Sequence, residues 1–221
     1  MSSKANPAVN AIGGRPRGFK PCCNCLNQSF CLEFVTMTDR ELRPIIRKQL
    51  AHEHPGAVLV EELSLIREKR SDIAIVNDAL WGYEIKSEHD RLVRLPEQVQ
   101  FYDAVFDYCH VIVASKFVDR VRMMVPAYWG ISRVVTEIET ARIELVRPSD
   151  RNTNTQVSAV VRLLWKVEAV RILRAAGCAI SMAHPLSKVW TACEQIPRDF
   201  LNSSVRAAVS QRKLLEGHER L

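Results

Sequence analysis

The chain has 221 residues, 47% of them hydrophobic, so it can bury one substantial core and carry a small appended lobe. Its formal net charge of +6 is uneven, because residues 1–40 carry +3, residues 41–150 carry −3 and residues 151–221 carry +6. No stretch approaches the ~18 apolar residues of a membrane span, and residues 1–18 lack a signal-peptide apolar run. We therefore expect a cytoplasmic protein that does not bind membranes.

The N-terminal segment, residues 1–37, is predicted to be a flexible arm that contains several cysteines. Its beginning combines Ser, Asn, Pro, Gly and Arg without periodicity. Cys22, Cys25 and Cys31 have the spacing of metal ligands and could hold zinc. The alternative is a segment of reduced thiols, since a chain without an export signal is not expected to form disulfides.

Residues 38–150 are predicted to form an α/β domain with one central sheet. Thr38 and Glu41 can form a capping box, which would begin a helix of about three turns. The later segments follow in the order of strands 57–61, 72–77 and 80–86, helix 92–107, strand 108–114, helix 117–125 and strand 128–135. Because only Asp78 and Ala79 separate the second and third strands, these two are expected to form a hairpin.

Residues 151–221 are predicted to form a basic helical lobe. A long amphipathic helix is expected over residues 157–176 with Gly177 as its C-terminal cap, followed by helices near 188–195 and 198–215. Arg162 and Lys166 would share one face of the long helix and bind substrate phosphates. The alternatives are a solvated basic face, packing on the core and self-association.

The predicted hairpin carries the residues with the clearest chemistry. Side chains alternate along a strand, so Gly82, Glu84 and Lys86 should share one face while the other face packs in the core. Opposite charges on a short apolar strand are costly to desolvate unless a cation or phosphate compensates them. Asp72, on the partner strand, would bring a second carboxylate beside Glu84 and create a site for Mg²⁺ or Mn²⁺.

These residues resemble the motif of the PD-(D/E)XK nuclease superfamily, and a further match resembles its RecB-like members. The matching residues are Ser71-Asp72, Glu84-Ile85-Lys86, the preceding helical Glu41, and Gln98 and Tyr102 of the Gln-x-x-x-Tyr pattern. The motif's proline is replaced by Ser71 in this chain. The resemblance covers about residues 38 to 135 and implies a restriction-endonuclease-like core, that is, a mixed sheet flanked by helices. The helical tail is similar to tails of small bacterial and phage members.

The resemblance also implies a role for each matching residue. Asp72, Glu84 and the Ile85 carbonyl would bind the metal, and Lys86 would position or activate the attacking water. Glu41 would complete the metal shell, although it could instead serve only the capping box. Glu84 and Lys86 could likewise be a simple ion pair at the surface.

Two further features depend on the same resemblance. Gln98 and Tyr102 lie one helical turn apart and would steady the substrate or the active-site residues, unless they are only a solvated amide and a core aromatic. Cys22, Cys25 and Cys31 resemble half of the iron–sulfur staple of some RecB-like nucleases, which carry it after the catalytic core instead of before it.

The expected function is metal-dependent hydrolysis of phosphodiester bonds in DNA, with RNA as the other substrate class, in DNA repair, mobile-element maintenance or defence. The sequence contains no Gly-rich phosphate loop, nucleophile elbow or two-histidine metal helix. The alternative is a nuclease fold that no longer cuts and serves as a nucleic-acid-binding or protein-interaction module. A homo-oligomer or a partner protein is compatible with either function.

Overall fold

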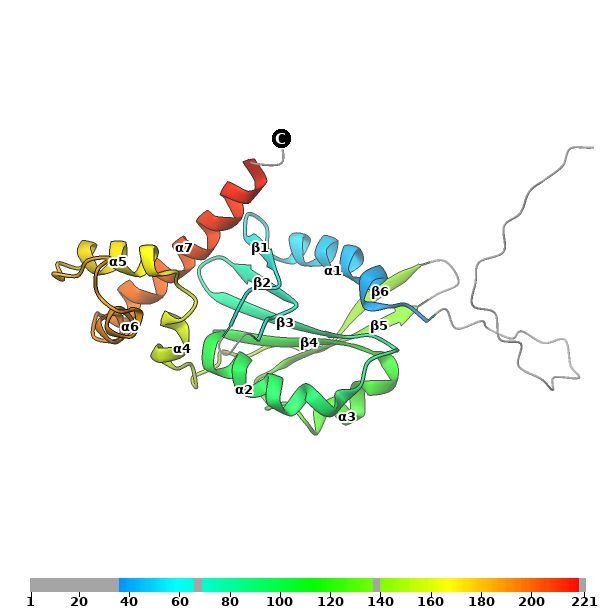
Figure 1. Ribbon diagram of the computed structural model, residues 1–221. Helices are drawn as coiled ribbons and strands as arrows, with labels where there is room; N and C mark the ends of the chain where they lie inside the picture. The colour runs from blue at the N-terminus through cyan, green and yellow to red at the C-terminus, as the bar shows by residue number, and fades with distance from the viewer. Residues whose placement is uncertain (1–35, 66–68, 137–139, 219–221) are drawn as a thin grey trace, which may run out of the picture. The chain divides into compact units, whose positions relative to one another are not determined.

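The structure is a computed structural model that describes residues 36–65, 69–136 and 140–218 (Figure 1). Its centre is a six-stranded mixed sheet in the order β1-β2-β3-β4-β5-β6. The strands are β1 (Val58–Glu61), β2 (Ile73–Val76), β3 (Leu80–Lys86), β4 (Tyr108–Ala114), β5 (Gly130–Thr136) and β6 (Ala141–Arg147). The pairs β3–β4 and β4–β5 are parallel and the other pairs are antiparallel. The expected α/β fold with a mixed sheet flanked by helices is confirmed.

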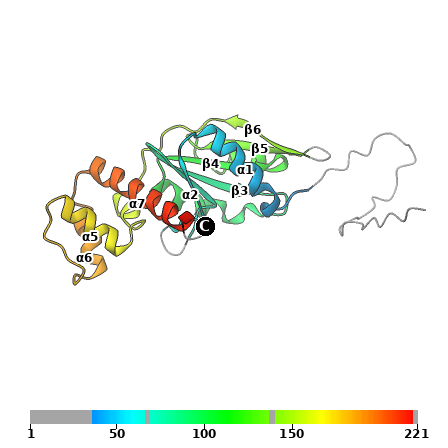
Figure 2. The same cartoon turned by 90° about the horizontal axis from the view of Figure 1, so that it is seen from above.

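Helices cover both faces of this sheet. Helix α1 (Asp39–Glu53) begins after Thr38, whose backbone N–H and hydroxyl both donate to the Glu41 carboxylate at 2.8 Å. Its buried stripe of Leu42, Ile46 and Leu50 packs on one face of the sheet. Figures 1 and 2 both place α1 over the strands.

The opposite face carries the two connections between parallel strands, since parallel strands need a crossover. The first connection is η2 (Leu92–Arg94) and α2 (Leu95–Val105), and the second is η3 (Ser115–Phe117) and α3 (Val118–Arg122). Helix α2 lies close to β3 at Gly82, where a Cβ atom would approach the Phe106 ring to 2.4 Å. Only glycine fits at this contact, which brings the end of the helix close to the strand.

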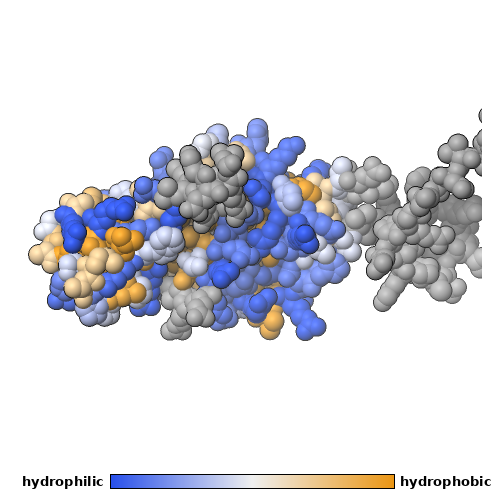
Figure 3. Space-filling view, turned by 45° about the horizontal axis from the view of Figure 1, so that its top comes forward, coloured by the Kyte–Doolittle hydropathy of each residue, from blue (hydrophilic) through white to orange (hydrophobic). Residues whose placement is uncertain are grey.

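The last four helices share the core on this second face. They are α4 (Val157–Val161), α5 (Lys166–Ala175), α6 (Leu186–Cys193) and α7 (Arg198–His218). Helix α4 contacts α2, and α7 contacts β1 and β2. Figure 3 shows apolar surface gathered over this helical group, where Trp165, Val167, Met182, Leu186 and Phe200 are exposed. Among the described helices, none is long and apolar enough to cross a membrane.

The prediction of one helix over residues 157–176 is wrong, because the chain breaks between α4 and α5. Val160, Val161, Ala169 and Val170 are all buried, and a continuous helix would point side chains at these positions in every direction. The break lets the chain bury all of them. Gly177 does follow α5 with a φ of +81°, as its predicted role as a cap requires.

The sheet also contains one strand more than the sequence predicted. Strand β6 forms its edge and pairs antiparallel with β5. Its side chains are only partly buried and alternate between apolar and charged residues, so no continuous apolar run marks it in the sequence. The expected hairpin of β2 and β3 is confirmed, with Ile73 opposite Tyr83 and Val76 opposite Leu80.

Candidate functional site

The hairpin brings Asp72 and Glu84 opposite each other. Asp72 directly precedes β2, and extending the register of Ile73 with Tyr83 by one residue pairs it with Glu84. Both carboxylates then lie on the sheet face covered by α2, because side chains alternate along each strand. The Glu84 side chain is buried, whereas the Asp72 side chain is 27% exposed to solvent.

Three side chains bind the carboxylate of Glu84. Lys86 forms an ion pair with Oε1, and the Gln98 amide donates a hydrogen bond to the same oxygen. The Tyr102 hydroxyl donates to Oε2 over 2.8 Å. Lys86 lies two residues farther on the same strand, and both members of the pair are buried. The charge of Glu84 is therefore compensated inside the protein, which a buried carboxylate requires.

Asp72 is bound differently. Its Oδ2 accepts the backbone N–H of Ile85 at 2.8 Å, and Arg43 of α1 lies 3.1 Å from Oδ1. Burial, followed by the nearby charge of Glu84, raises the pKa of Asp72 to about 6, despite the opposing effects of Ile85 N–H, Lys86 and Arg43. The carboxylate of Asp72 thus remains undercompensated in the protein by itself.

The hydroxyl of Tyr102, on helix α2, contacts both strands of the hairpin. It accepts the backbone N–H of Asp72 at 3.2 Å and lies 3.2 Å from the Tyr83 carbonyl, in addition to its bond with Glu84. Burial and the neighbouring Glu84 raise the pKa of Tyr102 well above its usual value. The phenol therefore stays neutral and keeps its proton for hydrogen bonding.

The donor set fits a hard divalent cation that keeps part of its water shell. Mg²⁺ is commonly held by one or two carboxylates together with water and substrate phosphate, and Asp72 and Glu84 supply such a pair. The Ile85 N–H points at Asp72, and the carbonyl of the same residue points to the same side of the strand. Within residues 36–65, 69–136 and 140–218, no group of three His, Cys, Asp or Glu side chains could hold a metal.

Glu41 lies in the capping box of α1 and not among these contacts. Its side chain is exposed, and hydrogen bonds from the Thr38 backbone and hydroxyl lower its pKa. No hydrogen bond or ion pair among the described residues joins it to Asp72 or Glu84. The residue of α1 that reaches the hairpin is instead Arg43, which the sequence did not indicate because its partner lies 29 positions away.

The proposed phosphate-binding pair of the C-terminal lobe is divided by the break between helices. Arg162 follows the last residue of α4, and its guanidinium lies 5.5 Å from the Trp190 ring centroid. Lys166 is the first residue of α5. The prediction that they share one helical face is therefore wrong. Cys22, Cys25 and Cys31 lie outside the described residues.

Comparisons with known proteins identify relatives without a stated activity. A family model described as bacteriophage P4 protein cII matches residues 41–216. Protein cII of Enterobacteria phage P4 is 25% identical over 126 residues, which are 57% of this chain and about half (48%) of that protein's length. A protein of unknown function from Silicibacter pomeroyi is 21% identical with a TM-score of 0.40, covering 65% of this chain and 94% of that one.

The family match includes the hairpin with Asp72 and Glu84, helix α2, helices α4 to α6 and most of α7. It agrees with the expected link to phages or mobile elements. Because the match extends over most of the chain, this protein belongs to the bacteriophage P4 protein cII family.

Proposed function

We propose that this protein is a divalent-metal-dependent nuclease that hydrolyses phosphodiester bonds, with DNA as its expected substrate. The observation that carries the proposal is the pair of facing carboxylates, Asp72 and Glu84, with the Lys86 ammonium beside them. A raised pKa at a buried acid that faces a second acid is typical of functional sites. The resemblance to PD-(D/E)XK nucleases rests on the same three residues.

In this proposal Asp72, Glu84 and the Ile85 carbonyl hold Mg²⁺ or Mn²⁺. Such an ion polarises the scissile phosphate and lowers the pKa of the attacking water. Lys86 contributes positive charge where the transition state gains negative charge. Its contact with Glu84 keeps the ammonium at the end of β3, next to the carboxylate pair.

Gln98 and Tyr102 act as positioning residues, because both are bound to Glu84 in the protein alone. They fix the orientation of its carboxylate from α2 and so reduce the reorganisation that metal binding requires. Arg162 and Lys166 are proposed to contribute separate phosphate contacts from the C-terminal helices.

The test is a cleavage assay on single-stranded and duplex DNA and on RNA, with Mg²⁺, with Mn²⁺ and with EDTA. Cleavage should require the metal and disappear in Asp72→Asn and Glu84→Gln. Lys86→Met should lower the rate while substrate binding is kept. Asp78→Asn is the matched control, because Asp78 is an exposed carboxylate in the turn of the same hairpin. Metal-independent cleavage, or full activity in Asp72→Asn, would reject the assigned site.

A second function, a nucleic-acid-binding module that does not cut, is favoured by one observation. Oε1 of Glu84 is already shared by Lys86 and Gln98, so the carboxylate can serve a structural role without any metal. Purified protein that binds nucleic acid but gives no cleavage with either metal would support this module over the nuclease.

A further inference from the structure

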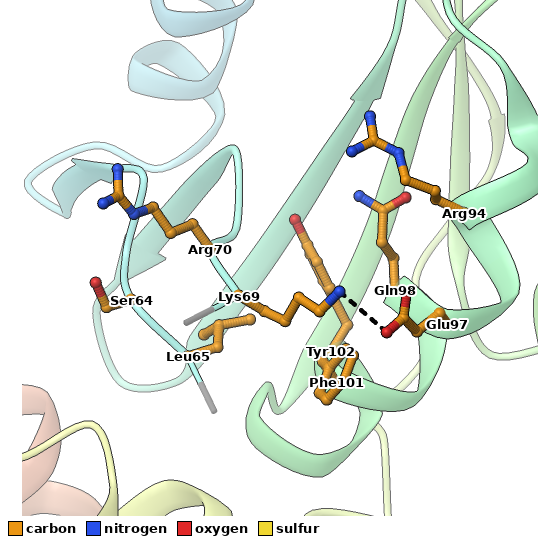
Figure 4. A pocket seen from close by; sticks show the side chains of 9 residues that line it. All are labelled: Ser64, Leu65, Lys69, Arg70, Arg94, Glu97, Gln98, Phe101 and Tyr102. Atoms are coloured by element: carbon orange, nitrogen blue, oxygen red, sulfur yellow. Dashed lines mark ion pairs between the residues drawn. The ribbon is translucent and has the colours of Figure 1, made fainter. Parts of the chain in front are cut away.

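A cleft of about 800 Å³ lies between the η2–α2 segment and the residues that connect β1 with β2 (Figure 4). One wall is the row of Arg94, Gln98 and Tyr102, which are spaced four residues apart and so follow one face of η2 and α2. The opposite wall comes from the connection between β1 and β2 and includes Lys69 and Arg70. The volume lies within the range of small-ligand sites, so it can enclose a short piece of one strand.

The cleft and the candidate active site share two residues. Gln98 and Tyr102 line the cleft and also bind Glu84. A molecule lying along the α2 wall would therefore approach Glu84 at one end and Arg94 at the other. Because the two sites share these residues, the cleft is part of the candidate active site and not an unrelated surface depression.

The charge of the cleft is positive. Among the described lining residues, Lys69, Arg70 and Arg94 face it together with one acid, Glu97, which pairs with Lys69 at 3.0 Å. Arg70 pairs with the exposed Glu62, and no ion pair among the described residues involves Arg94. An excess of cations that are weakly paired or unpaired suits phosphate groups, which release counterions when they are bound.

Two further features suit the bases of a strand. Phe101 is a partly buried ring in the wall, with Lys69 Nζ 5.5 Å from its centroid, and can offer an apolar face for stacking. Oε1 of Gln98 is buried and has no hydrogen-bond partner, although the Nε2 of the same amide is bound to Glu84. A buried acceptor without a donor is costly, and a ligand donor would satisfy it.

We propose that this cleft binds a few nucleotides of single-stranded nucleic acid, with phosphates on Arg70 and Arg94 and a base against Phe101. That the strand is a substrate rests on the proposed nuclease function, because the cleft would lead its backbone to Asp72 and Glu84. Basic grooves with interleaved aromatic rings bind single strands with little sequence preference.

The test is a titration of a labelled single-stranded DNA of about 12 nucleotides with the full chain. EDTA prevents cleavage, and the titration is repeated at several NaCl concentrations. The Arg70→Ala/Arg94→Ala variant should bind more weakly and lose about 1.4 from the slope of log affinity against log salt, since each single-strand contact contributes ~0.7. Phe101→Leu should weaken binding roughly 5-fold or more without changing that slope.

The matched control is Arg47→Ala/Lys48→Ala. Both residues are exposed on α1, which packs on the other face of the sheet, and Arg47 has a partly exposed acidic partner in Glu61, as Arg70 has an exposed one in Glu62. This control should bind like the unmodified protein. Unchanged affinity and slope in Arg70→Ala/Arg94→Ala, or a duplex that competes as well as the single strand, would overturn the proposal.

The outcomes for the cleft and for the nuclease are distinguishable. Binding that depends on Arg70 and Arg94 in a protein that cuts nothing with Mg²⁺ or Mn²⁺ supports the cleft and rejects the nuclease. Cleavage by the unmodified protein, together with unchanged binding in the double variant, supports the nuclease and rejects the cleft.

Discussion

The hydroxyl of Tyr102 donates to Oε2 of Glu84 over 2.8 Å, so helix α2 holds the central carboxylate of strand β3. The hydroxyl oxygen of Tyr102 also accepts the backbone N–H of Asp72, so Tyr102 contacts the other strand of the hairpin as well. A single phenol thus fixes the distance between the helix and both acidic positions.

Tyr102→Phe should lower the free energy of unfolding by about 1–3 kcal/mol, because it leaves a buried carboxylate oxygen and a backbone N–H without this partner. Cleavage should fall as well, since Glu84 is no longer oriented. Chemical denaturation and initial rates measure the two effects. Tyr108→Phe is the control, because the Tyr108 ring stacks on Trp81 and no described hydrogen bond uses its hydroxyl. Equal losses in both variants would contradict the role of Tyr102.

Asp72 should make the stability of the metal-free protein depend on pH. Its pKa is raised from 3.8 to about 6, so its contribution to stability is fully present below pH ~4 and is lost as the pH rises through 6. Asp72→Asn removes this loss and should stabilise the metal-free protein at pH 7.5 by up to about 3 kcal/mol, with partial exposure reducing the value.

Thermal unfolding of both proteins from pH 4 to pH 8 measures this difference. The two curves should separate as the pH rises, and they should converge near pH 4. Mn²⁺ should then raise the melting temperature of the unmodified protein but not of Asp72→Asn, because a ligand stabilises only the state that binds it. A destabilised Asp72→Asn at pH 7.5 would show that Arg43 and the Ile85 N–H outweigh the repulsion.

Lys86 and Glu84 should behave as a coupled pair in unfolding experiments. Lys86→Met leaves the buried Glu84 without its cation and should cost about 3–5 kcal/mol, whereas Lys86→Met combined with Glu84→Gln should cost clearly less. A double-mutant cycle from urea unfolding measures the coupling. Strictly additive losses would mean that the ion pair does not form in solution.

How well the sequence predicted the site depended on how local each contact is. The hairpin and the alternation of side chains along β3 follow from short-range periodicity, whereas the place of Gln98 and Tyr102 beside Glu84 is implied by the resemblance to RecB-like nucleases. The contact of Arg43 with Asp72 joins two elements that only tertiary packing brings together, and no local pattern indicates it.

The errors in the fold have a similar origin. Strand β6 is the edge strand of the sheet, and its charged residues interrupt the apolar run that would mark a strand in the sequence. It is defined mainly by its pairing with β5. The break between α4 and α5 follows from burial on all sides, which the basic, helix-like spacing of residues 157–176 does not reveal.

This break gives a last prediction, because it places Arg162 and Lys166 in different electrostatic surroundings. Arg162 lies over the Trp190 ring, so Arg162→Ala should lower stability by about 0.5–1 kcal/mol. Lys166 begins α5, where the positive end of the helix dipole disfavours a cation, so Lys166→Ala should leave stability unchanged or raise it by a few tenths of a kcal/mol. Because the two sites share no partner, the double variant should show the sum of the two effects. Urea unfolding of the three variants measures this, with Arg171→Ala as an exposed control on α5. Equal losses from Arg162→Ala and Lys166→Ala, or strong coupling between them, would instead indicate one continuous helix in solution.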